Sequence, residues 1–391
     1  MIRVGFVNVF AVREWLGGLN YLRNLLQAVA GLEGRQIEPV LFTGAATDAS
    51  IAAEFSFMPV VLTRALDRGH PLWLLRKTVQ RLLGADRVLE KVLASQGISI
   101  LSHSRDLGRG ARIAGIGWVP DLQHRHLSHL FSDEKFAQRE AQIAQALDAC
   151  VRLIVSSETV ARDLRAGYPQ HAGKIRVLRF VSGLLHGGAF PQAAELKRRY
   201  LIDGPYLHLP NQFWAHKNHA VVVEALARLK ASGRSVTVIA TGLMEDPRRP
   251  QHVQELMQRV VREGLGNLFR PLGVVPYRDM LGLMRHAAAV INASLFEGWS
   301  TSVEEAKSMG KALVLSGISV HREQAPERGS YFDPHDAQDA ARALWDAWSA
   351  FDPAADEIAV ARAAAALPAR LRQFAEGYQA IVLEALEAAH D

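Results

Sequence analysis

The sequence predicts an α/β protein with two doubly wound domains, each built on a parallel sheet. The chain has 391 residues, which is long for one hydrophobic core and suits two of similar size. Short apolar runs alternate with amphipathic helical stretches in two series, separated by a glycine-rich break at residues 181–191. Because ligands of such sheets bind beyond the carboxyl ends of the strands, we expect the two domains to face each other across a cleft.

The expected domain boundaries follow this break. Residues 1–190 form the first predicted domain and residues 191–370 the second. Residues 371–391 are expected to form a C-terminal helix, for which packing back on the first domain is one option.

In the first series, the strands are short apolar runs that begin almost at the N-terminus. They are expected at Ile2–Val9, Pro39–Thr43, Ile98–Ser102, Ile116–Val119, Leu153–Ser156 and Ile175–Leu178. The amphipathic stretches between them predict helices at Gly18–Leu32, Leu74–Ala94 and Asp133–Cys150.

The second series repeats the same alternation. Its strands are expected at Tyr206–Leu209, Val236–Thr241, Ala288–Asn292 and Ala312–Ser316. Its helices are expected at His219–Ser232, Val253–Glu263 and Thr301–Met309, followed by an alanine-rich helical tail from Ala354.

Composition narrows the class of protein. The formal net charge of +5 suits anionic partners such as phosphates or acidic lipids. Nucleic acid is not expected, because zinc-finger spacing, an RNA-recognition aromatic motif and a long Lys/Arg tract are all missing. The single cysteine, Cys150, allows no internal disulfide, and no apolar run is long enough to span a bilayer. The start of the chain has no signal-peptide pattern, so we expect a cytoplasmic protein.

The most informative segment is Phe296–Ala306, which follows a predicted strand and opens a helix. Gly298 allows the backbone to approach a ligand closely. The amides of Ser300–Ser302 lie at a helix N-terminus, where unpaired N–H groups and the helix dipole favour a phosphate. Glu297 and Glu305, with seven residues between them, could accept hydrogen bonds from hydroxyl groups. Taken alone, the pair also fits a capped surface helix.

A second segment, Leu209–His219, lies between a predicted strand and a helix. Lys217 is a point charge there that could neutralise a diphosphate. A solvated lysine at a helix start is the other interpretation of this segment. The helix-start amides of Ser300–Ser302 favour the interpretation in which Lys217 belongs to a phosphate site.

Together the two segments resemble the retaining glycosyltransferase family 4, which has the GT-B fold. Glu297 through Glu305 correspond to that family's Glu-x7-Glu motif, with Trp299 in place of Phe and Ser300, Thr301 and Ser302 in place of Gly-Leu-Pro. The resemblance implies that Glu297 contacts the donor sugar and that Glu305 binds the nucleotide ribose. Lys217 matches the family's diphosphate lysine, whereas Gln212 stands where its arginine is expected.

Weaker matches extend the predicted donor site. Gly17 and Gly18 form a turn after the first strand whose amides could meet a pyrophosphate, as a glycine loop does in the family. The pattern G-x-G-x-x-G is missing, which excludes a nicotinamide dinucleotide site. The resemblance also implies donor contacts for Thr241 and Gly242 at a strand end, and for Val275 in a loop that often faces the nucleobase.

The segment Gly117–His126 supplies acceptor-side candidates at a strand end. Asp121 and His124 could orient a sugar or bind an acceptor hydroxyl. The resemblance implies a histidine where this chain has Pro120, and His124 is our candidate to replace it. The spacing of His124, His126 and His129 is poor for a tetrahedral site, so no metal is expected.

Basic and apolar residues interleave at helical spacing over Leu72–Leu83, followed by Arg87 and Lys91. One interpretation is a helix that lies in an anionic membrane interface. The other is an ordinary amphipathic helix whose apolar stripe packs in the core.

The resemblance implies a retaining transferase that moves a hexose-type sugar from a UDP- or GDP-sugar to a glycan or lipid-linked acceptor. Synthesis of bacterial surface polysaccharide or lipopolysaccharide is the expected setting, without a required cofactor. A lipid-linked acceptor would bring peripheral contact with the inner face of the membrane. The alternatives are an epimerase or phosphorylase of the same fold, or a non-catalytic nucleotide-sugar-binding protein, to which Gln212 and the missing histidine point.

Overall fold

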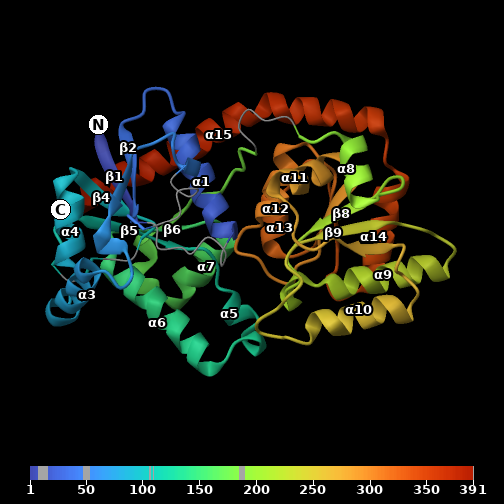
Figure 1. Cartoon of the computed structure of the whole chain (residues 1–391), viewed down its shortest axis with the longest axis horizontal. Helices are drawn as coiled ribbons and strands as arrows, with labels where there is room; N and C mark the ends of the chain where they lie inside the picture. The colour runs from blue at the N-terminus through green and yellow to red at the C-terminus, as the bar shows by residue number, and fades with distance from the viewer. Residues whose placement is uncertain (8–15, 47–52, 105–106, 109, 185–189, 391) are drawn as a thin grey trace. The chain divides into compact units, whose positions relative to one another are not determined.

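The structure is a computed structural model that describes residues 1–7, 16–46, 53–104, 107–108, 110–184 and 190–390 (Figure 1). The chain divides into two compact units. The first unit comprises Met1–Leu122, Asp133–Val181 and Ala369–Asp391, and the second comprises Gln123–Ser132 and Ser182–Pro368. The short segment Gln123–Ser132 therefore belongs to the second unit, although the sequence assigned it to the first domain.

The first unit is built on a parallel sheet of seven strands in the order β3-β2-β1-β4-β5-β6-β7. The strands are β1 (Ile2–Val7), β2 (Ile37–Gly44), β3 (Val60–Thr63), β4 (Ile98–Ser102), β5 (Ala114–Val119), β6 (Arg152–Val155) and β7 (Ile175–Val177). The helical elements are α1 (Leu16–Ala30), η1 (Arg64–Leu66), α3 (Pro71–Leu83), α4 (Arg87–Ser95), α6 (Asp133–Ala149), α7 (Glu158–Gly167) and η3 (Pro169–Lys174). The strand order reverses between β1 and β4, which is the doubly wound arrangement.

The second unit has a parallel sheet of six strands in the order β10-β9-β8-β11-β12-β13. The strands are β8 (Leu207–Pro210), β9 (Val238–Thr241), β10 (Phe269–Pro271), β11 (Ala289–Asn292), β12 (Leu313–Ser316) and β13 (Gly329–Phe332). The helical elements are α5 (Gln123–His126), η2 (Ser128–Leu130), α8 (Ala193–Tyr200), η4 (Ala215–Lys217), α9 (His219–Ala231), α10 (His252–Arg262), α11 (Tyr277–His286), α12 (Thr301–Ser308), α13 (Ser319–Gln324) and α14 (Ala337–Ser349). The order reverses between β8 and β11, so the loops after these two strands lie at a switch point, where ligands of such sheets bind.

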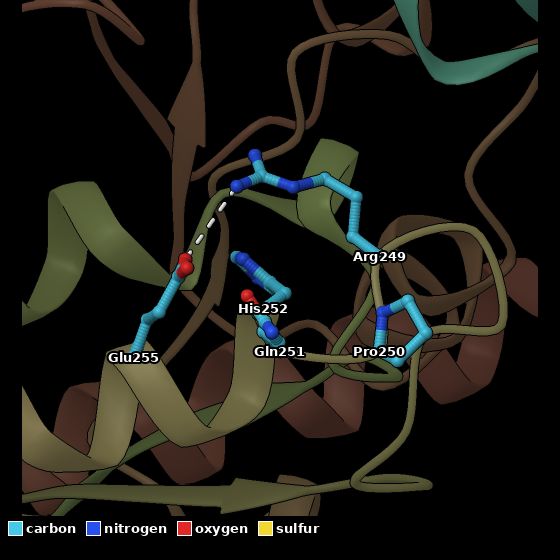
Figure 2. Close-up of a pocket in the computed structure, with 5 residues that line it drawn as sticks. All are labelled: Arg249, Pro250, Gln251, His252 and Glu255. Carbon is cyan, nitrogen blue, oxygen red and sulfur yellow. Dashed lines mark hydrogen bonds and ion pairs between the residues drawn. The ribbon is translucent and has the colours of Figure 1, made fainter.

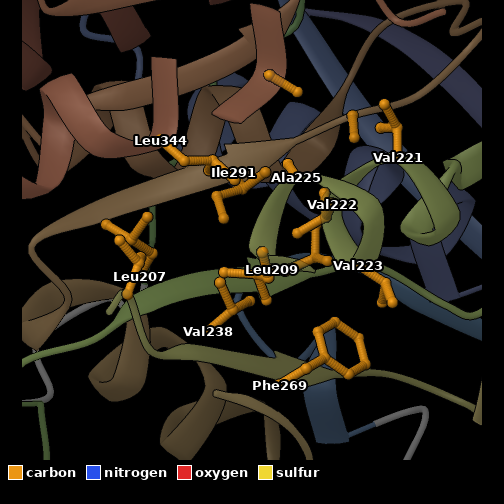
Figure 3. Close-up of a cluster of buried hydrophobic side chains, with 14 of the residues drawn as sticks. Leu207, Leu209, Val221, Val222, Val223, Ala225, Val238, Phe269, Ile291 and Leu344 are labelled. Carbon is orange, nitrogen blue, oxygen red and sulfur yellow. The ribbon is translucent and has the colours of Figure 1, made fainter. Parts of the chain in front are cut away.

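Alternating side chains bury both faces of the second sheet. Val238 and Ala240 of β9 join one apolar cluster with residues of α9, α10 and α14, whereas Ile239 between them joins another with residues of α8 and α11. Figure 3 shows the first of these clusters, in which side chains of β8, such as Leu209, lie beside those of α9, such as Val222. Burial on both faces is what the unbroken apolar strands predict, and the prediction of two doubly wound domains is confirmed.

Two details of the predicted elements are wrong. The single helix expected over Leu74–Ala94 is two helices, α3 and α4, because Gly84 adopts a left-handed backbone (φ 64°) that ends α3. Asp86 then starts α4, since its carboxylate accepts a hydrogen bond from the Leu89 amide at 3.2 Å. The strands β3, β10 and β13 were not predicted; β10 and β13 include polar residues, proline or glycine and form no apolar run.

The last helix, α15 (Pro353–His390), contributes residues to both units. Pro368, inside the helix, is the last residue that clusters with the second unit. Beyond it, the Glu384 carboxylate accepts hydrogen bonds from Arg152 at 2.9 Å and Arg176 at 2.8 Å, which hold this part of α15 on β6 and β7. Among the described residues, no helix combines the length and the apolar character that crossing a membrane requires.

Candidate active site

The centre of the candidate site is an ion pair between Lys217 and Glu297. Lys217 ends η4, after β8, and Glu297 lies in the loop after β11, the neighbouring strand. The lysine Nζ lies 2.6 Å from Glu297 Oε1, and the two side chains are only 15% and 10% exposed. The Ser294 hydroxyl donates a second hydrogen bond to the same oxygen at 2.7 Å. The structure thus brings together two of the charged residues that the sequence selected.

The Glu297 carboxyl is held in its ionised form. Burial alone would raise the pKa of Glu297, but the positive charge of Lys217 and the hydrogen bonds from Lys217 and Ser294 outweigh it, so the pKa is lowered. A nearly buried pair of opposite charges contributes little net stability. Such pairs at the carboxyl edge of a sheet are therefore candidates for chemistry.

A buried histidine that the sequence did not select lies close to this pair. His321 is fully buried in α13, and its Nδ1 lies 2.9 Å from the Ser316 carbonyl oxygen. Because a carbonyl only accepts, Nδ1 carries the proton and Nε2 offers a lone pair. Among the described residues, Nε2 has no hydrogen-bond partner. Burial lowers the pKa of His321 to about 4, even though the negative charge of Glu297 acts in the opposite direction.

The second glutamate of the motif, Glu305, is buried in α12 and bonded to the opening residue of α11. The Tyr277 hydroxyl donates to Glu305 Oε1 at 2.7 Å. Tyr277 directly follows the loop that contains Val275, whose own side chain packs against the apolar cluster around Tyr206 and Ile239. The Glu305 carboxylate is therefore positioned by a hydroxyl group, while Val275 contributes to the core.

The three predicted helix-start amides differ in what they contact. The Ser300 amide donates to Gln324 Oε1 at 3.3 Å, and the Ser300 hydroxyl accepts a hydrogen bond from Asn292 Nδ2 at 2.7 Å. Thr301 and Ser302 begin α12, where the first amides of a helix have no acceptor within the helix. Of the predicted amides, those of Thr301 and Ser302 are therefore best placed for an anion. Beside them, Gly298 is buried and Trp299 is half-buried.

Around the end of β8, several buried polar atoms lack a partner among the described residues. They are Asn211 Oδ1, Gln212 Oε1 and Trp214 Nε1. Buried polar atoms are normally hydrogen-bonded, so unpaired ones near a sheet edge indicate a place for a ligand or ordered water. Gln212 therefore provides an unpaired acceptor where the resemblance implied an arginine.

The two predicted residues at the end of β9 have structural contacts. The Thr241 hydroxyl lies 2.9 Å from His208 Nε2 in the buried sheet. Gly242 has a φ of 143°, and a Cβ at this position would lie 2.5 Å from the Asn211 carbonyl oxygen. Only glycine fits there, so the backbone after β9 packs tightly on the backbone after β8.

A further cation that the sequence did not select, Arg248, lies in the loop after β9. Its Nη2 donates to His216 Nδ1 at 2.9 Å, and its Nη1 donates to Gln123 Oε1 at 2.8 Å. Burial lowers the pKa of His216, and the charges of Lys217 and Arg248 lower it further, so this imidazole is neutral. Arg248 also approaches Asp246, at 3.5 Å. Arg248 follows β9 and His321 follows β12, and both strands were predicted. A search for polar residues after every predicted strand would have selected both residues.

The acceptor-side candidates fall into different units. Asp121 belongs to the first unit, where its carboxylate pairs with Arg139 at 3.1 Å. His124 is buried in α5, which belongs to the second unit. In the same helix, the His126 ring stacks on Phe296 with centroids 4.6 Å apart, so α5 packs beside the loop that carries Glu297.

The glycine pair lies in the first unit. Gly17 and Gly18 are in the first turn of α1, which begins at Leu16. Their backbone is helical and forms no separate tight turn, and Gly17 is exposed. Trp15, which precedes this helix, lies outside the described residues.

The described residues contain no cluster of three or more His, Cys, Asp or Glu side chains arranged to hold a metal ion. One surface hollow of about 220 Å³ lies at the start of α10 and is lined by Arg249, Pro250, Gln251, His252 and Glu255 (Figure 2). Arg249 and Glu255 approach each other across it at 3.5 Å. Because it holds none of the predicted site residues, we do not assign the donor to this hollow.

Comparison with known proteins relates this geometry to a family. Residues 206–349, which contain Lys217, Glu297, Glu305 and His321, match the family model for glycosyl transferases group 1. No curated protein sequence matches the chain.

Solved structures with low sequence identity share the fold. A glycosyltransferase from Rickettsia africae has a TM-score of 0.66 and 15% identity, over 97% of this chain and 98% of that one. Anabaena HepE in complex with UDP-glucose has a TM-score of 0.68 and 16% identity, over 97% and 100% of the two chains. The lipopolysaccharide outer core galactosyltransferase WaaB has a TM-score of 0.59 and 12% identity, over 98% and 99%. The two sheets therefore have the GT-B fold, and the family match supports a glycosyltransferase.

Proposed function

We propose that this chain is a retaining glycosyltransferase that moves a hexose-type sugar from a UDP- or GDP-sugar to a glycan or lipid-linked acceptor. The observation that carries the proposal is the Lys217–Glu297 pair, which lies at the switch point of the second sheet and inside the part that matches glycosyl transferases group 1. Anabaena HepE, a structural neighbour, is bound to UDP-glucose in its solved structure, which supports a nucleotide-sugar donor.

Lys217 is proposed to stabilise the leaving diphosphate. An ammonium has three N–H donors, and the bond to Glu297 uses one of them. The other two could reach phosphate oxygens, and a fixed cation that meets developing negative charge lowers the barrier to departure. Arg248, which shares His216 as a neighbour with Lys217, adds positive potential. These cations make a metal ion unnecessary in the proposal.

The two glutamates are proposed to bind hydroxyl groups of the donor. Glu297, ionised and hydrogen-bonded by Ser294, would accept from hydroxyls of the transferred sugar. Glu305, positioned by Tyr277, would accept from the ribose. The amides of Thr301 and Ser302 would contact the diphosphate at the helix start.

The rest of the predicted site completes the proposal. We assign Gly17 and Gly18 to the diphosphate and Asp121 and His124 to the sugar or acceptor. Synthesis of a bacterial surface polysaccharide or lipopolysaccharide is the proposed setting, which agrees with the name of the neighbour WaaB. A lipid-linked acceptor places the protein at the inner face of the membrane.

The test is a donor screen by thermal shift with UDP, GDP, ADP and their sugars, followed by slow hydrolysis or transfer with the best donor. We expect release of nucleoside diphosphate from the wild type and its loss in Glu297→Gln. Arg342→Gln, which removes one end of an exposed ion pair on α14, is the matched control. Turnover of the donor to an isomeric nucleotide-sugar would instead indicate an epimerase, and consumption of free phosphate without nucleotide a phosphorylase.

A further inference from the structure

The helix α3 of the first unit has its polar and apolar faces reversed. All five of its leucines are exposed: Leu72 by 44%, Leu74 and Leu75 by 52% each, Leu82 by 78% and Leu83 by 64%. The buried residue of this helix is an arginine, Arg76. The structure therefore contradicts the interpretation in which the apolar stripe packs in the core.

Polar contacts explain how α3 is held in this orientation. Arg76 Nε lies 2.7 Å from Asp86 Oδ2, with the two side chains only 10% and 2% exposed. Its Nη1 also donates to the Ala65 carbonyl oxygen at 3.3 Å. Because the Arg76 guanidinium is bonded to two groups on the buried side of α3, it fixes the rotation of the helix about its axis. Leu74, Leu75 and Leu82 are consequently directed away from the side of α3 on which Arg76 is buried.

The exposed side chains form one continuous stripe. At 100° per residue, Leu74, Leu75 and Leu82 lie on the side of the helix opposite Arg76. Lys77 and Arg81 lie along one border of this stripe and are also exposed. An apolar stripe bordered by cations is the pattern of a helix that lies in a membrane interface.

The surrounding surface is cationic. Residues 57–91 carry seven Arg or Lys and three Asp or Glu, a net charge of +4, against +5 for the whole chain. Asp86 and Glu90 are buried and Asp67 is half-buried. The exposed charges of this region are all positive, namely those of Arg64, Arg68, Lys77, Arg81, Arg87 and Lys91.

We propose that α3 and the cationic surface around it dock the protein on an anionic phospholipid bilayer, with Leu74, Leu75 and Leu82 inserted among the lipids. Charge favours this occupant over a second copy of the chain, because an isologous contact through α3 would bring two surfaces of net charge +4 together. An anionic bilayer supplies both the apolar layer and the opposite charge. The proposal does not depend on the sugar-transfer reaction.

The test is co-sedimentation of the purified full-length chain with vesicles of phosphatidylcholine, with and without phosphatidylglycerol. We expect the wild type to pellet with the anionic vesicles and to be released by salt. The triple variant Leu74→Ser/Leu75→Ser/Leu82→Ser and the variant Lys77→Gln/Arg81→Gln should each need roughly tenfold more lipid for half-binding.

Matched controls remove similar groups elsewhere. Val261→Ser/Ile358→Ser removes apolar side chains that are 77% and 70% exposed in the second unit, and Arg262→Gln/Arg342→Gln removes two exposed cations there. Circular dichroism should show all four variants folded, because the replaced groups are exposed. The proposal is overturned if the wild type ignores anionic vesicles or if the controls lose binding equally. It is also overturned if light scattering shows a dimer that the triple variant separates while lipid binding is unchanged.

Discussion

Each unit has a histidine near the carboxyl ends of its strands, half-buried in the first unit and buried in the second, and the two differ in their hydrogen bonds. In the first unit, His103 follows β4, with Nε2 2.9 Å from the Tyr21 hydroxyl and Nδ1 2.8 Å from the Ser102 hydroxyl. In the second unit, His321 has a partner for Nδ1 alone among the described residues. A histidine bonded at both nitrogens is part of the packing, whereas an unpaired buried nitrogen close to an ion pair indicates a place for a ligand or ordered water.

The groups around the two histidines differ in the same way. Tyr21 stacks on Trp118 with ring centroids 4.6 Å apart, so the surroundings of His103 are neutral and aromatic. The surroundings of His321 include the opposite charges of Glu297 and Lys217. Burying charges costs stability, and buried charged groups are often found at functional sites. The comparison therefore favours the second unit for the proposed chemistry, and the predictions below test it in order of decreasing effect.

The largest effect is expected from Lys217→Ala. Turnover of the nucleotide-sugar should fall by about 10² to 10³-fold, the range for loss of one fixed group that stabilises developing charge. The variant should also lose about 3 kcal/mol of unfolding free energy, because Glu297 is left buried without its cation. Steady-state kinetics and denaturant unfolding measure the two effects.

A double-mutant cycle with Glu297→Gln is the control for this prediction. The double variant should regain part of the stability, since no unpaired charge is then buried, but none of the turnover. Normal turnover in Lys217→Ala would remove the basis for assigning the chemistry to this pair.

Acid should destabilise both units through their histidines. Burial lowers the pKa of His103 to about 3 and that of His321 to about 4, from an ordinary 6.5. Because the unfolded chain binds these protons more readily, stability is full above pH 6.5 and falls as the pH drops toward 4. Each histidine should account for about 3 kcal/mol of this loss.

The unfolding free energies of His103→Phe and His321→Phe, measured as a function of pH, give the loss of stability that each histidine causes. Both variants should show a flatter pH dependence than the wild type between pH 6.5 and 4. The pKa of Glu297 is also lowered, so its contribution is lost below its ordinary value of 4.5 and overlaps only the acid end of this window. An unchanged slope in both variants would contradict histidines whose pKa is lowered in the folded protein.

At neutral pH the same two variants should differ. His103→Phe leaves two hydroxyls, those of Tyr21 and Ser102, without this partner, and we expect it to lose about 2 kcal/mol of stability with unchanged donor affinity. His321→Phe should lose less stability, because the Ser316 hydroxyl still donates to the Ser294 carbonyl, but it should weaken donor binding about tenfold. Titration calorimetry with the best donor separates the two. Equal effects on donor affinity would undo the comparison.

The smallest effect is expected from Tyr277→Phe. It removes the hydrogen bond to Glu305 and leaves the ring in place, so we expect a loss of about 1 kcal/mol in donor binding. The KM for the donor should rise while kcat is unchanged, because Glu305 is proposed to bind the ribose, away from the reacting bond. Tyr331→Phe, which removes a weaker bond of 3.3 Å to the His321 carbonyl, is the control. A fall in kcat alone would place Tyr277 nearer the chemistry.

Much of the fold could be predicted from the sequence, because its strands are apolar runs long enough to recognise. Lys217 and Glu297 could be selected because both lie where a strand passes into a helix, the place where ligands meet such sheets. Their contact was not predictable from local sequence, since 80 residues separate them and only the order β8-β11 brings their loops together.

The remaining features, the site role of His321 and the orientation of α3, depend on which groups become buried when the chain folds. His321 combines an unpaired buried nitrogen with a position close to Glu297 and Lys217, and a sequence does not contain that information. The direction of α3 was also not predictable, because an amphipathic pattern fits either face inward. Arg76 decides it by pairing with Asp86 across the end of the helix.

The most direct test of the central claim compares a nucleoside diphosphate with its nucleoside on one variant. Calorimetric titration of wild type and Lys217→Ala with UDP and uridine, or with the guanine pair if the screen selects it, isolates the phosphate contact. We predict that Lys217→Ala binds the diphosphate at least about tenfold more weakly, while binding of the nucleoside is unchanged. Equal affinity of both proteins for the diphosphate would contradict a donor site built around Lys217 and Glu297.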